Sequence, residues 1–373
     1  MRISIPKEIK NHEYRVGMTP AGVRELVSHG HQVKVGVDCG AIIGFSNDLY
    51  LNAGAEVETV VEELFDWAEM IVKVKEPQVE EYQLLTSNHC LFTYLHLAPD
   101  PKQAKGLLSS NCTAIAYETV TDALGRLPLL APMSEVAGRM SVQAGAHCLE
   151  ISQGGCGTLL GGVPGVYPGR VTVIGGGVVG INAARMALGL GADVTILDRS
   201  LDRLKELDGI FGPRLKTLYA TVDTIEESVI SADLVIGAVL VPGAAAPKLV
   251  NRQLLTKMKP GSVVVDVAVD QGGCFETTRA TTHADPTYIE EGVIHYCVAN
   301  MPGAVARTST LALTNATLPF VLELADKGVE AALLANEPLR QGLNVYHGSI
   351  THPGVADSLG YQYLSPLSAI QKD

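Results

Sequence analysis

The sequence predicts an α/β protein with two doubly wound domains, one of them a Rossmann dinucleotide-binding domain, and a cleft between them. The first observation is the length of 373 residues, because a domain spans roughly 150 residues. The second is the alternation of short apolar runs with longer amphipathic stretches along the chain, which is typical of α/β folds. The third is a glycine-rich turn directly after the apolar residues 171–174.

Composition and charge exclude several classes of partner. The net charge of −12 argues against a nucleic acid or an anionic membrane as partner. The seven cysteines are scattered and form no Cys-x-x-Cys pair, so we expect reduced thiols and a cytoplasmic protein. The N-terminus lacks the apolar segment of a signal peptide. The longest uncharged run, residues 151–169, is broken by glycines and prolines, so no membrane helix is predicted.

The first part of the chain is predicted to form a parallel sheet. Its candidate strands are residues 3–5, 32–37, 70–75, 90–96 and 113–118. Between the first two lies the clearest helix, with Thr19 as cap, Pro20 in the first position and Gly30 at the end. These signals favour strand–helix–strand units in this part.

The middle of the chain begins with a helix that Ser134 is expected to cap and that runs to about residue 151. The Gly/Pro-rich stretch that follows is interleaved with Leu and Val, which favours a packed loop. A second α/β series then predicts the six strands of a Rossmann domain, at residues 171–174, 193–197, 216–220, 234–239, 262–267 and 295–298.

The last part returns to helix from Thr308 and contains no strand series long enough for a separate sheet. We therefore expect it to pack back onto the first domain, which would be discontinuous. The predicted domains are residues 1–130 with 306–373, for the substrate, and residues 131–305, for the dinucleotide.

The glycine turn carries the fingerprint of a dinucleotide site. Gly175, Gly177 and Gly180 give G-x-G-x-x-G after an apolar strand; they permit the tight turn, the approach of a pyrophosphate, and close packing of helix on strand. Asp198 follows roughly 20 residues later, where an acid binds the adenosine ribose hydroxyls. A carboxylate there favours NAD over NADP, although the adjacent Arg199 could pair with a 2′-phosphate. The alternative is a glycine turn without a ligand.

Polar residues stand where the predicted strands end, and ligands of parallel sheets bind beyond the carboxyl ends of strands. Arg15, Lys75 and His96 come from the first domain, and Asp270 and Asn300 from the second. We interpret them as one site beside the nicotinamide.

Each of these side chains has a simpler interpretation. Arg15 could be a surface charge, and Lys75 or its neighbour Lys73 could simply flank a strand. His96 could be a core histidine, and Asp270 or Asp266 could hold the following glycine loop.

The residue types fit the oxidation of a small amino or hydroxy acid. A substrate carboxylate is bound by an arginine fork or by the point charge of a lysine. A proton must leave the substrate nitrogen or oxygen when hydride leaves its α-carbon. An imidazole titrates in the useful range, so His96 is the candidate to accept that proton. If the substrate is an amine, water must add to an imine, and Asp270 could serve that step.

The chain resembles the alanine dehydrogenase family along essentially its whole length. The segments that carry the resemblance are IPKEIKNHEYRVGMTPAGV, KVKEP, FTYLHLA, LPLLAPMSEVAGRMS, GGVPGV, VIGGGVVG, VIGAVLVPGAAAPKLV, VVVDVAVDQGGCFE, YCVANMPGAV and TSTLALTNATLPF. The resemblance implies that Arg15 and Lys75 bind the substrate, that His96 transfers the proton, and that Asp270 is the second catalytic group.

The same resemblance implies contacts with NAD, a partner set and an assembly. The NAD contacts would be Ser134, Gly175, Gly177, Val178, Val179, Gly180, Asp198, Arg203, Val239, Leu240, Val267, Ala268, Val269, Asp270, Arg279, Val298, Ala299, Asn300 and Met301. Substrates would be L-alanine, pyruvate and ammonia, and the family forms homohexamers. Some members bind a metal through an acid and a histidine four residues apart in a late helix. Here Glu323 and Lys327 occupy those positions, and since lysine is a poor ligand we predict no metal.

The function predicted from the sequence is NAD-dependent oxidative deamination of L-alanine. Two alternatives remain at this point: a dehydrogenase of another small amino or hydroxy acid on the same fold, and a non-catalytic protein that responds to NAD. The second would keep the glycine fingerprint without needing the cations and the imidazole.

Overall fold

The computed structural model describes residues 1–239 and 246–371. The chain forms two compact units: Met1–Met133 with Val305–Asp373, and Ser134–Ala304. The predicted division at residues 130/131 and 305/306 lies close to these limits. The assignment of substrate to the first unit and of dinucleotide to the second stays a prediction.

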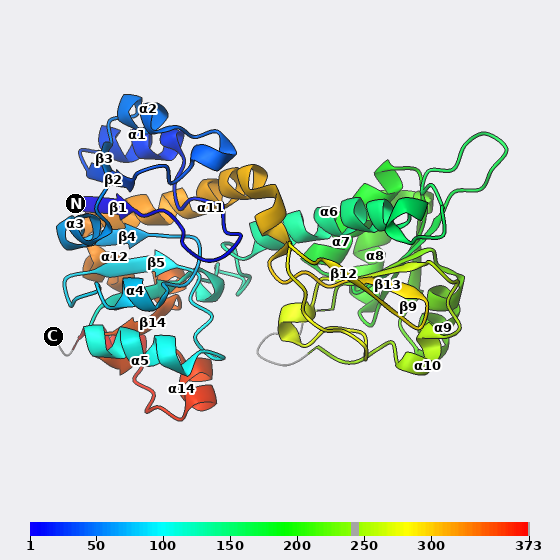
Figure 1. Ribbon diagram of the computed structural model, residues 1–373. Helices are drawn as coiled ribbons and strands as arrows, with labels where there is room; N and C mark the ends of the chain where they lie inside the picture. The colour runs from blue at the N-terminus through cyan, green and yellow to red at the C-terminus, as the bar shows by residue number, and fades with distance from the viewer. Residues whose placement is uncertain (240–245, 372–373) are drawn as a thin grey trace. The chain divides into compact units, whose positions relative to one another are not determined.

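The first unit contains an eight-stranded sheet in the order β15-β14-β6-β5-β4-β1-β2-β3. Strands β3, β2, β1, β4, β5 and β14 can be followed in this sequence in Figure 1. The six strands β1 to β6 are parallel, and β14 and β15 are added antiparallel at one edge. The strands are β1 (Arg2–Ile5), β2 (Gln32–Gly36), β3 (Glu56–Glu58), β4 (Met70–Val72), β5 (Cys90–Thr93), β6 (Thr113–Ala116), β14 (Leu343–Tyr346) and β15 (Ser349–Ile350).

The five strands predicted for this part are present, and each of the last four ends earlier than predicted. Three strands were not predicted. The last part of the chain forms no separate sheet, but its strands β14 and β15 extend the sheet of the first unit. The last part of the chain is thus joined to the first unit partly by pairing of its strands with the sheet there.

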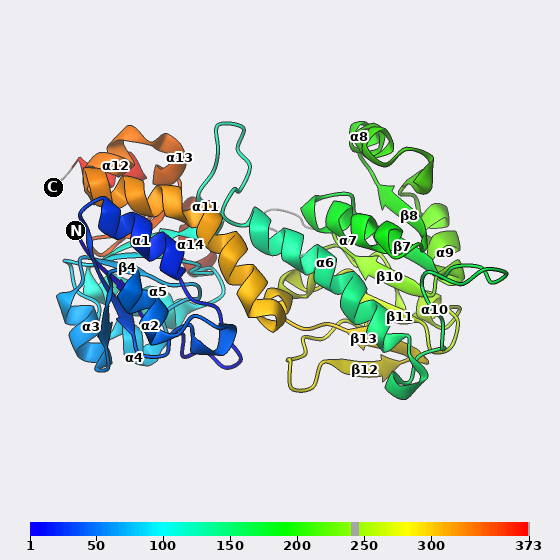
Figure 2. The ribbon, with the colours of Figure 1, turned by 90° about the horizontal axis from the view of Figure 1, so that it is seen from above.

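Helices cover both faces of this sheet. Side chains from α3 and α5 pack with Ile71, Leu91 and Ala114 in one core cluster, and Figure 2 shows α1 beside α11. The helices are α1 (Pro20–Ser28), η1 (Ala41–Ile43), α2 (Asn47–Asn52), α3 (Val61–Trp67), α4 (Val79–Tyr82), α5 (Pro101–Ser110), η2 (Tyr117–Thr119), α11 (Ala306–Lys327), α12 (Val329–Ala335), α13 (Glu337–Arg340), α14 (Pro353–Leu359) and α15 (Pro366–Ile370).

Helix α1 has the ends that its sequence predicts. The Thr19 side chain accepts the N–H of Gly22 at 3.1 Å, and Pro20 occupies the first turn. Gly30 has a φ of +86° just beyond the last turn, a conformation that glycine adopts without the steric cost of a Cβ.

Helix α6 (Ala131–Cys148) corrects one prediction. The helix starts before Ser134, which lies inside its first turn and is not its cap, and it ends before residue 151. Pro132 is the second helical residue, and a proline is favourable in the first turn because the N–H it lacks would have no partner there. The serine signal is therefore overridden by the proline that precedes it.

The second unit contains a seven-stranded sheet in the order β12-β13-β11-β10-β7-β8-β9. Without the antiparallel edge strand β12, this is the 3-2-1-4-5-6 order of a Rossmann domain, so the predicted fold class is confirmed. The strands are β7 (Arg170–Ile174), β8 (Asp193–Asp198), β9 (Leu215–Tyr219), β10 (Leu234–Gly237), β11 (Val263–Asp266), β12 (Thr287–Glu290) and β13 (Val293–Tyr296).

This sheet is buried on both faces. Alternate residues of its strands point to opposite faces: Val263 and Val265 pack with α6 and α7, and Val264 packs with α9 and α10. Besides α6, the helices are η3 (Ile151–Gln153), α7 (Val178–Gly189), α8 (Leu201–Phe211), η4 (Gly212–Arg214), α9 (Val222–Ser231), α10 (Arg252–Leu255), η5 (Val269–Gln271) and η6 (Met301–Val305). In the described part of the chain, no helix has the length and apolar character needed to cross a membrane.

Candidate active site

Three predicted substrate residues share one edge of the first sheet. Arg15 follows β1, Lys75 follows β4 and His96 follows β5, and these strands are neighbours in the order β5-β4-β1. Because the strands are parallel, their carboxyl ends lie together. The topology therefore brings an arginine, a lysine and a histidine to the same edge.

Arg15 is held by a glutamate that the sequence analysis did not single out. Its Nε and Nη2 atoms donate to the two carboxylate oxygens of Glu13, at 2.7 and 2.5 Å, and Nη1 lies 3.1 Å from the sulfur of Met133. The side chain is 2% exposed, so the surface-charge alternative is wrong. Burial opposes the charge, but the hydrogen bonds and the negative charge of Glu13, with smaller contributions from Tyr94 and Glu8, together outweigh it and raise the pKa of Arg15. The sequence feature that could have indicated this ion pair is the glutamate two residues before the arginine.

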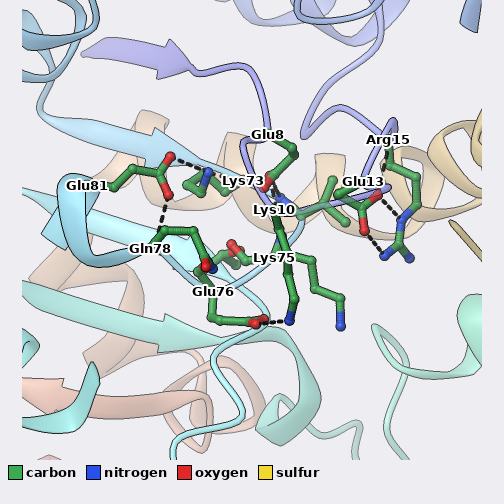
Figure 3. A network of polar contacts seen from close by, with 11 residues as sticks. Glu8, Lys10, Glu13, Arg15, Lys73, Lys75, Glu76, Gln78 and Glu81 are labelled. Carbon is green, nitrogen blue, oxygen red and sulfur yellow. Dashed lines mark hydrogen bonds and ion pairs between the residues drawn. The ribbon is translucent and has the colours of Figure 1, made fainter. Parts of the chain in front are cut away.

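The two lysines of the KVKEP segment have different environments (Figure 3). The Lys73 ammonium is fully buried, 3.2 Å from Glu8 and 2.6 Å from Glu81. Lys75 is half-buried, and no hydrogen bond or ion pair of its ammonium is found among the described residues. Burial lowers the pKa of Lys75, and the nearby Arg15 charge adds to that effect.

The backbone of Lys75 is fixed on both sides. Its N–H donates to Glu8 Oε1 at 3.3 Å, and its carbonyl accepts the Thr93 hydroxyl at 2.9 Å. A fixed backbone with an unpaired ammonium is suited to binding an anion. Of the two lysines, Lys75 is thus the one available to a ligand.

His96 lies at the surface of the carboxyl edge. Its side chain is 46% exposed, so the core-histidine alternative is wrong. The ring stacks on Tyr94 with 5.8 Å between centroids and 5° between planes, and Tyr94 is itself fixed by donating its hydroxyl to the Leu129 carbonyl at 2.6 Å. An accessible imidazole with a restrained ring can exchange protons with a bound molecule.

In the second unit, the glycine turn lies where β7 ends and α7 begins. Gly175 has a φ of +103°. A Cβ on Gly180 would lie 1.8 Å from the Gly175 carbonyl oxygen, whereas one on Gly177 would meet no atom within 4 Å. Helix α7 has no side-chain cap, so the N–H groups of its first turn, at Val178, Val179 and Gly180, are available to an anion.

Asp198 ends β8 and faces the glycine turn. Its two oxygens accept the N–H groups of Gly176 at 2.7 Å and Ser200 at 2.8 Å, and each oxygen retains a lone pair for a hydroxyl. Arg203 donates through Nε to the Gly176 carbonyl at 2.5 Å. Arg199 is exposed. The turn, Asp198 and Arg203 therefore form one hydrogen-bonded set that fits a dinucleotide.

Asp266 organises the loop that carries Asp270. Its buried carboxylate accepts the N–H groups of Ala268 at 3.1 Å and Cys274 at 2.8 Å, and the hydroxyl of Thr278. Burial raises the pKa of Asp266, against these hydrogen bonds. Asp270 lies exposed in η5. Of the two aspartates, Asp266 is thus the one that holds the glycine loop.

The remaining predicted cofactor contacts also follow strand ends. Val239 follows β10, Val267, Ala268 and Val269 follow β11, and Val298, Ala299, Asn300 and Met301 follow β13. Arg279 is exposed, with its guanidinium 3.9 Å from the centre of the Tyr288 ring, and Ser134 lies in α6. Leu240 lies outside the described residues.

Glu323 and Lys327, the two residues of α11 at the family's metal-binding positions, are both hydrogen-bonded. The Lys327 ammonium lies 2.9 Å from Glu323 Oε1, and Asn336 donates to Glu323 Oε2 at 2.7 Å. Among residues 1–239 and 246–371, no group of three or more His, Cys, Asp or Glu side chains is arranged to hold a metal.

Fold and site together define an α/β protein with a Rossmann unit, whose uncapped glycine turn fits a dinucleotide, and a second α/β unit that gathers two cations and an imidazole at one sheet edge. Comparison with known proteins gives the family. Residues 4–137 match the family described as alanine dehydrogenase/PNT, N-terminal domain, and residues 141–353 its C-terminal domain. The chain belongs to the alanine dehydrogenase/pyridine nucleotide transhydrogenase family.

Individual relatives agree along the full length. The chain is 62% identical to an alanine dehydrogenase of Halomonas elongata, over 99% of this chain and 100% of the relative. It is 56% identical to an alanine dehydrogenase of Bacillus subtilis, over 100% of this chain and 98% of that one. A solved L-alanine dehydrogenase structure superposes with a TM-score of 0.94 at 52% identity, over 96% of this chain and 99% of that structure.

Proposed function

We propose that this protein is an NAD-dependent L-alanine dehydrogenase that interconverts L-alanine with pyruvate and ammonia. The observation that carries the proposal is the grouping of Arg15, Lys75 and His96 at the carboxyl edge of the β5-β4-β1 strands. The chain also matches alanine dehydrogenases over its full length at 62% and 56% identity.

Arg15 and Lys75 bind the substrate in this proposal. Glu13 balances the charge of Arg15, so that Lys75 contributes the net positive charge that attracts the carboxylate or the carbonyl oxygen. Burial and the neighbouring Arg15 lower the pKa of Lys75. A carboxylate bound there would offset both effects and raise it.

His96 and Asp270 are the acid–base groups in this proposal. His96 removes the proton from the substrate nitrogen while hydride leaves the α-carbon, which forms an imine. Asp270 assists the addition of water to the imine carbon, and the C–N bond then breaks to release ammonia. Asp270 is exposed on η5, and the buried Asp266 fixes the loop behind it.

The glycine turn holds the cofactor. NAD, when bound, supplies the hydride acceptor. The free N–H groups at the start of α7 bind the pyrophosphate, Asp198 binds the adenosine ribose, and Arg203 steadies the turn from the side of α8. The contacts of Ser134, Val239, Val267–Val269, Arg279 and Val298–Met301 with NAD, and that of Leu240, belong to the same proposal.

Steady-state kinetics test substrate and cofactor together. We expect NADH formation from L-alanine at alkaline pH, where release of a proton favours oxidation, and slower turnover of serine, glycine and lactate. NADP should be used poorly because the Asp198 carboxylate repels a 2′-phosphate. Absence of NADH formation from L-alanine would refute the proposal, and faster turnover of another substrate would favour the alternative dehydrogenase.

Substitutions in the glycine turn test the cofactor site separately. In Gly180→Ala the new Cβ meets the Gly175 carbonyl, so we expect a lower melting temperature and a loss of NADH affinity of about 10-fold or more. In Gly177→Ala the Cβ has open space in the protein, so the melting temperature should stay unchanged. The same Cβ would stand where the pyrophosphate approaches the backbone, so the affinity for NADH should fall.

Gly209→Ala is the control for these two variants. Gly209 lies in α8, and a Cβ there also meets nothing within 4 Å. NADH affinity should stay unchanged, and the protein should gain up to about 1 kcal/mol because alanine is the better helix former. Fluorescence titration with NADH gives the affinities. If Gly177→Ala and Gly209→Ala bind equally well, the turn is not the pyrophosphate site.

Location and assembly complete the proposal. Six of the seven cysteines are buried free thiols, which supports a reducing compartment such as the cytoplasm. We also propose that the chain forms homohexamers, as the family resemblance implies. Light scattering should then give a mass about six times the 39.4 kDa of the chain.

A further inference from the structure

The turn that carries His96 is held by Glu118, a residue in η2 just after β6. Its Oε1 accepts the His96 N–H at 2.6 Å, and both of its oxygens lie 3.2 Å from the Leu95 nitrogen. Strands β5 and β6 are adjacent and in register up to Thr93 and Ala116. Glu118 therefore reaches the His96 turn from the neighbouring strand of the same sheet.

His96 has a backbone conformation that needs such support. Its φ is +48°, in the left-handed region, where a residue with a Cβ loses roughly 1–2 kcal/mol. Hydrogen bonds from backbone N–H groups to a carboxylate are stronger than those to a neutral acceptor. Glu118 thus stabilises the left-handed backbone conformation from which the exposed His96 side chain extends.

The ring itself is restrained by Glu118 and by stacking on Tyr94. Its Nδ1 lies 3.9 Å from Glu118 Oε1, and its face stacks on Tyr94. Among the described residues, no hydrogen bond to either ring nitrogen is found. The orientation of the imidazole therefore depends on the Glu118 carboxylate and on one aromatic contact.

We propose that Glu118 is a positioning residue for His96: its carboxylate holds the left-handed turn and orients the imidazole for proton transfer. The inference rests on the proposed function of His96. Glu118 touches no reacting atom, so its effect should fall on the catalytic step and spare the binding of substrate and cofactor.

Two substitutions and a matched control test this role. Glu118→Ala should lower kcat about 100-fold, because a small displacement of a catalytic group has that order of effect. KM for alanine and Kd for NADH should stay within about 2-fold. Glu118→Gln keeps an oxygen that accepts the two N–H groups, so its kcat should recover to within about 10-fold of the wild type.

Glu58 provides the control. It also accepts two consecutive backbone N–H groups, from Thr59 at 2.8 Å and Val60 at 3.2 Å, but it lies on the edge strand β3, away from His96 in the sheet order. Glu58→Ala and Glu58→Gln should leave kcat and KM unchanged, and melting temperatures of all four variants allow rates to be compared at equal folded fraction.

The outcomes separate the inference from the function on which it rests. A wild-type kcat in the Glu118 variants, a loss confined to KM, or equal losses in Glu118→Ala and Glu118→Gln would overturn the positioning role while the wild type remains an active alanine dehydrogenase. A wild-type protein that does not oxidise alanine would overturn the proposed function and the inference together.

Discussion

Replacement of His96 by alanine should lower kcat for L-alanine oxidation by about 10²- to 10⁴-fold, the range that general acid–base catalysis contributes. The ring is accessible at the carboxyl edge, with 46% of its side chain exposed. NADH binding should be nearly unchanged, because the predicted cofactor residues belong to the other unit.

The measurements are stopped-flow or steady-state turnover and a fluorescence titration with NADH. His147→Ala is the control: that imidazole is also exposed and lies 3.4 Å from a glutamate, Glu150, but it belongs to α6. It should retain wild-type kinetics. Normal turnover in His96→Ala would remove His96 from the mechanism, and loss of NADH binding would assign it a structural role instead.

The sequence predicted the parts of the fold that depend on local pattern. Buried parallel strands are short apolar runs, and the runs that became β4, β5 and β11 are recognisable for that reason. The glycine turn and Asp198 are equally local, because each glycine has its own steric requirement in one strand–turn–helix unit. Polar residues at strand ends then followed from the strand assignments.

Edge strands were not predictable in the same way. Strand β3 has the sequence Glu-Val-Glu, and it is recognised as a strand only by its pairing with β2. Strand β14, which lies beside the edge strand β15, pairs with β6 from far along the chain. Both strands depend on pairing between distant segments, and such pairing cannot be inferred from the local sequence of either segment alone.

The ion pairs of the site were missed for the same reason. Glu8 and Glu81 lie far from each other in the sequence, and only the fold brings both to Lys73. Because these ion-pair partners could not be identified from the sequence, it was not possible to predict which lysine of KVKEP is structural. Glu118 was likewise included in a predicted strand, and its contact with His96 comes from the pairing of β5 with β6.

The second large effect is expected at Lys73, where substitution by methionine should lower the free energy of unfolding by about 3–5 kcal/mol. Lys73, Glu8 and Glu81 are each at most 3% exposed. Burial alone would lower the pKa of Lys73, but the two glutamates outweigh it and raise the pKa. Methionine has a similar length and no charge, so it would leave two buried carboxylates without a cation.

Lys34→Met is the matched control. Lys34 also faces two glutamates, Glu56 at 3.4 Å and Glu58 at 3.7 Å, but Glu56 is 75% exposed. Because the Lys34–Glu56 pair is exposed and Lys34 and Glu58 are 19% and 17% exposed, this variant should lose clearly less stability than Lys73→Met. Urea unfolding at fixed protein concentration compares the two, and equal losses would show that burial does not set the cost at Lys73.

The Lys73→Met effect should depend on pH. The pKa of Glu8 is raised above 4.5, chiefly by burial and against the charge of Lys73, and it should rise further without Lys73. A carboxyl with a higher pKa in the folded than in the unfolded state holds more protons when folded, so stability falls as the pH rises above about 4.5. The loss should therefore be larger at pH 8 than at pH 5.5.

A triple variant isolates the cause. Glu8→Gln and Glu81→Gln, combined with Lys73→Met, remove both stranded charges while an amide oxygen can still accept the Val74 N–H that Glu8 accepts at 2.7 Å. This protein should recover much of the lost stability and lose the pH dependence.

Because Glu8 also accepts the Lys75 N–H, Lys73→Met should raise KM for pyruvate even where the protein stays folded. An unchanged KM would mean that Lys75 keeps its position without the buried ion pairs.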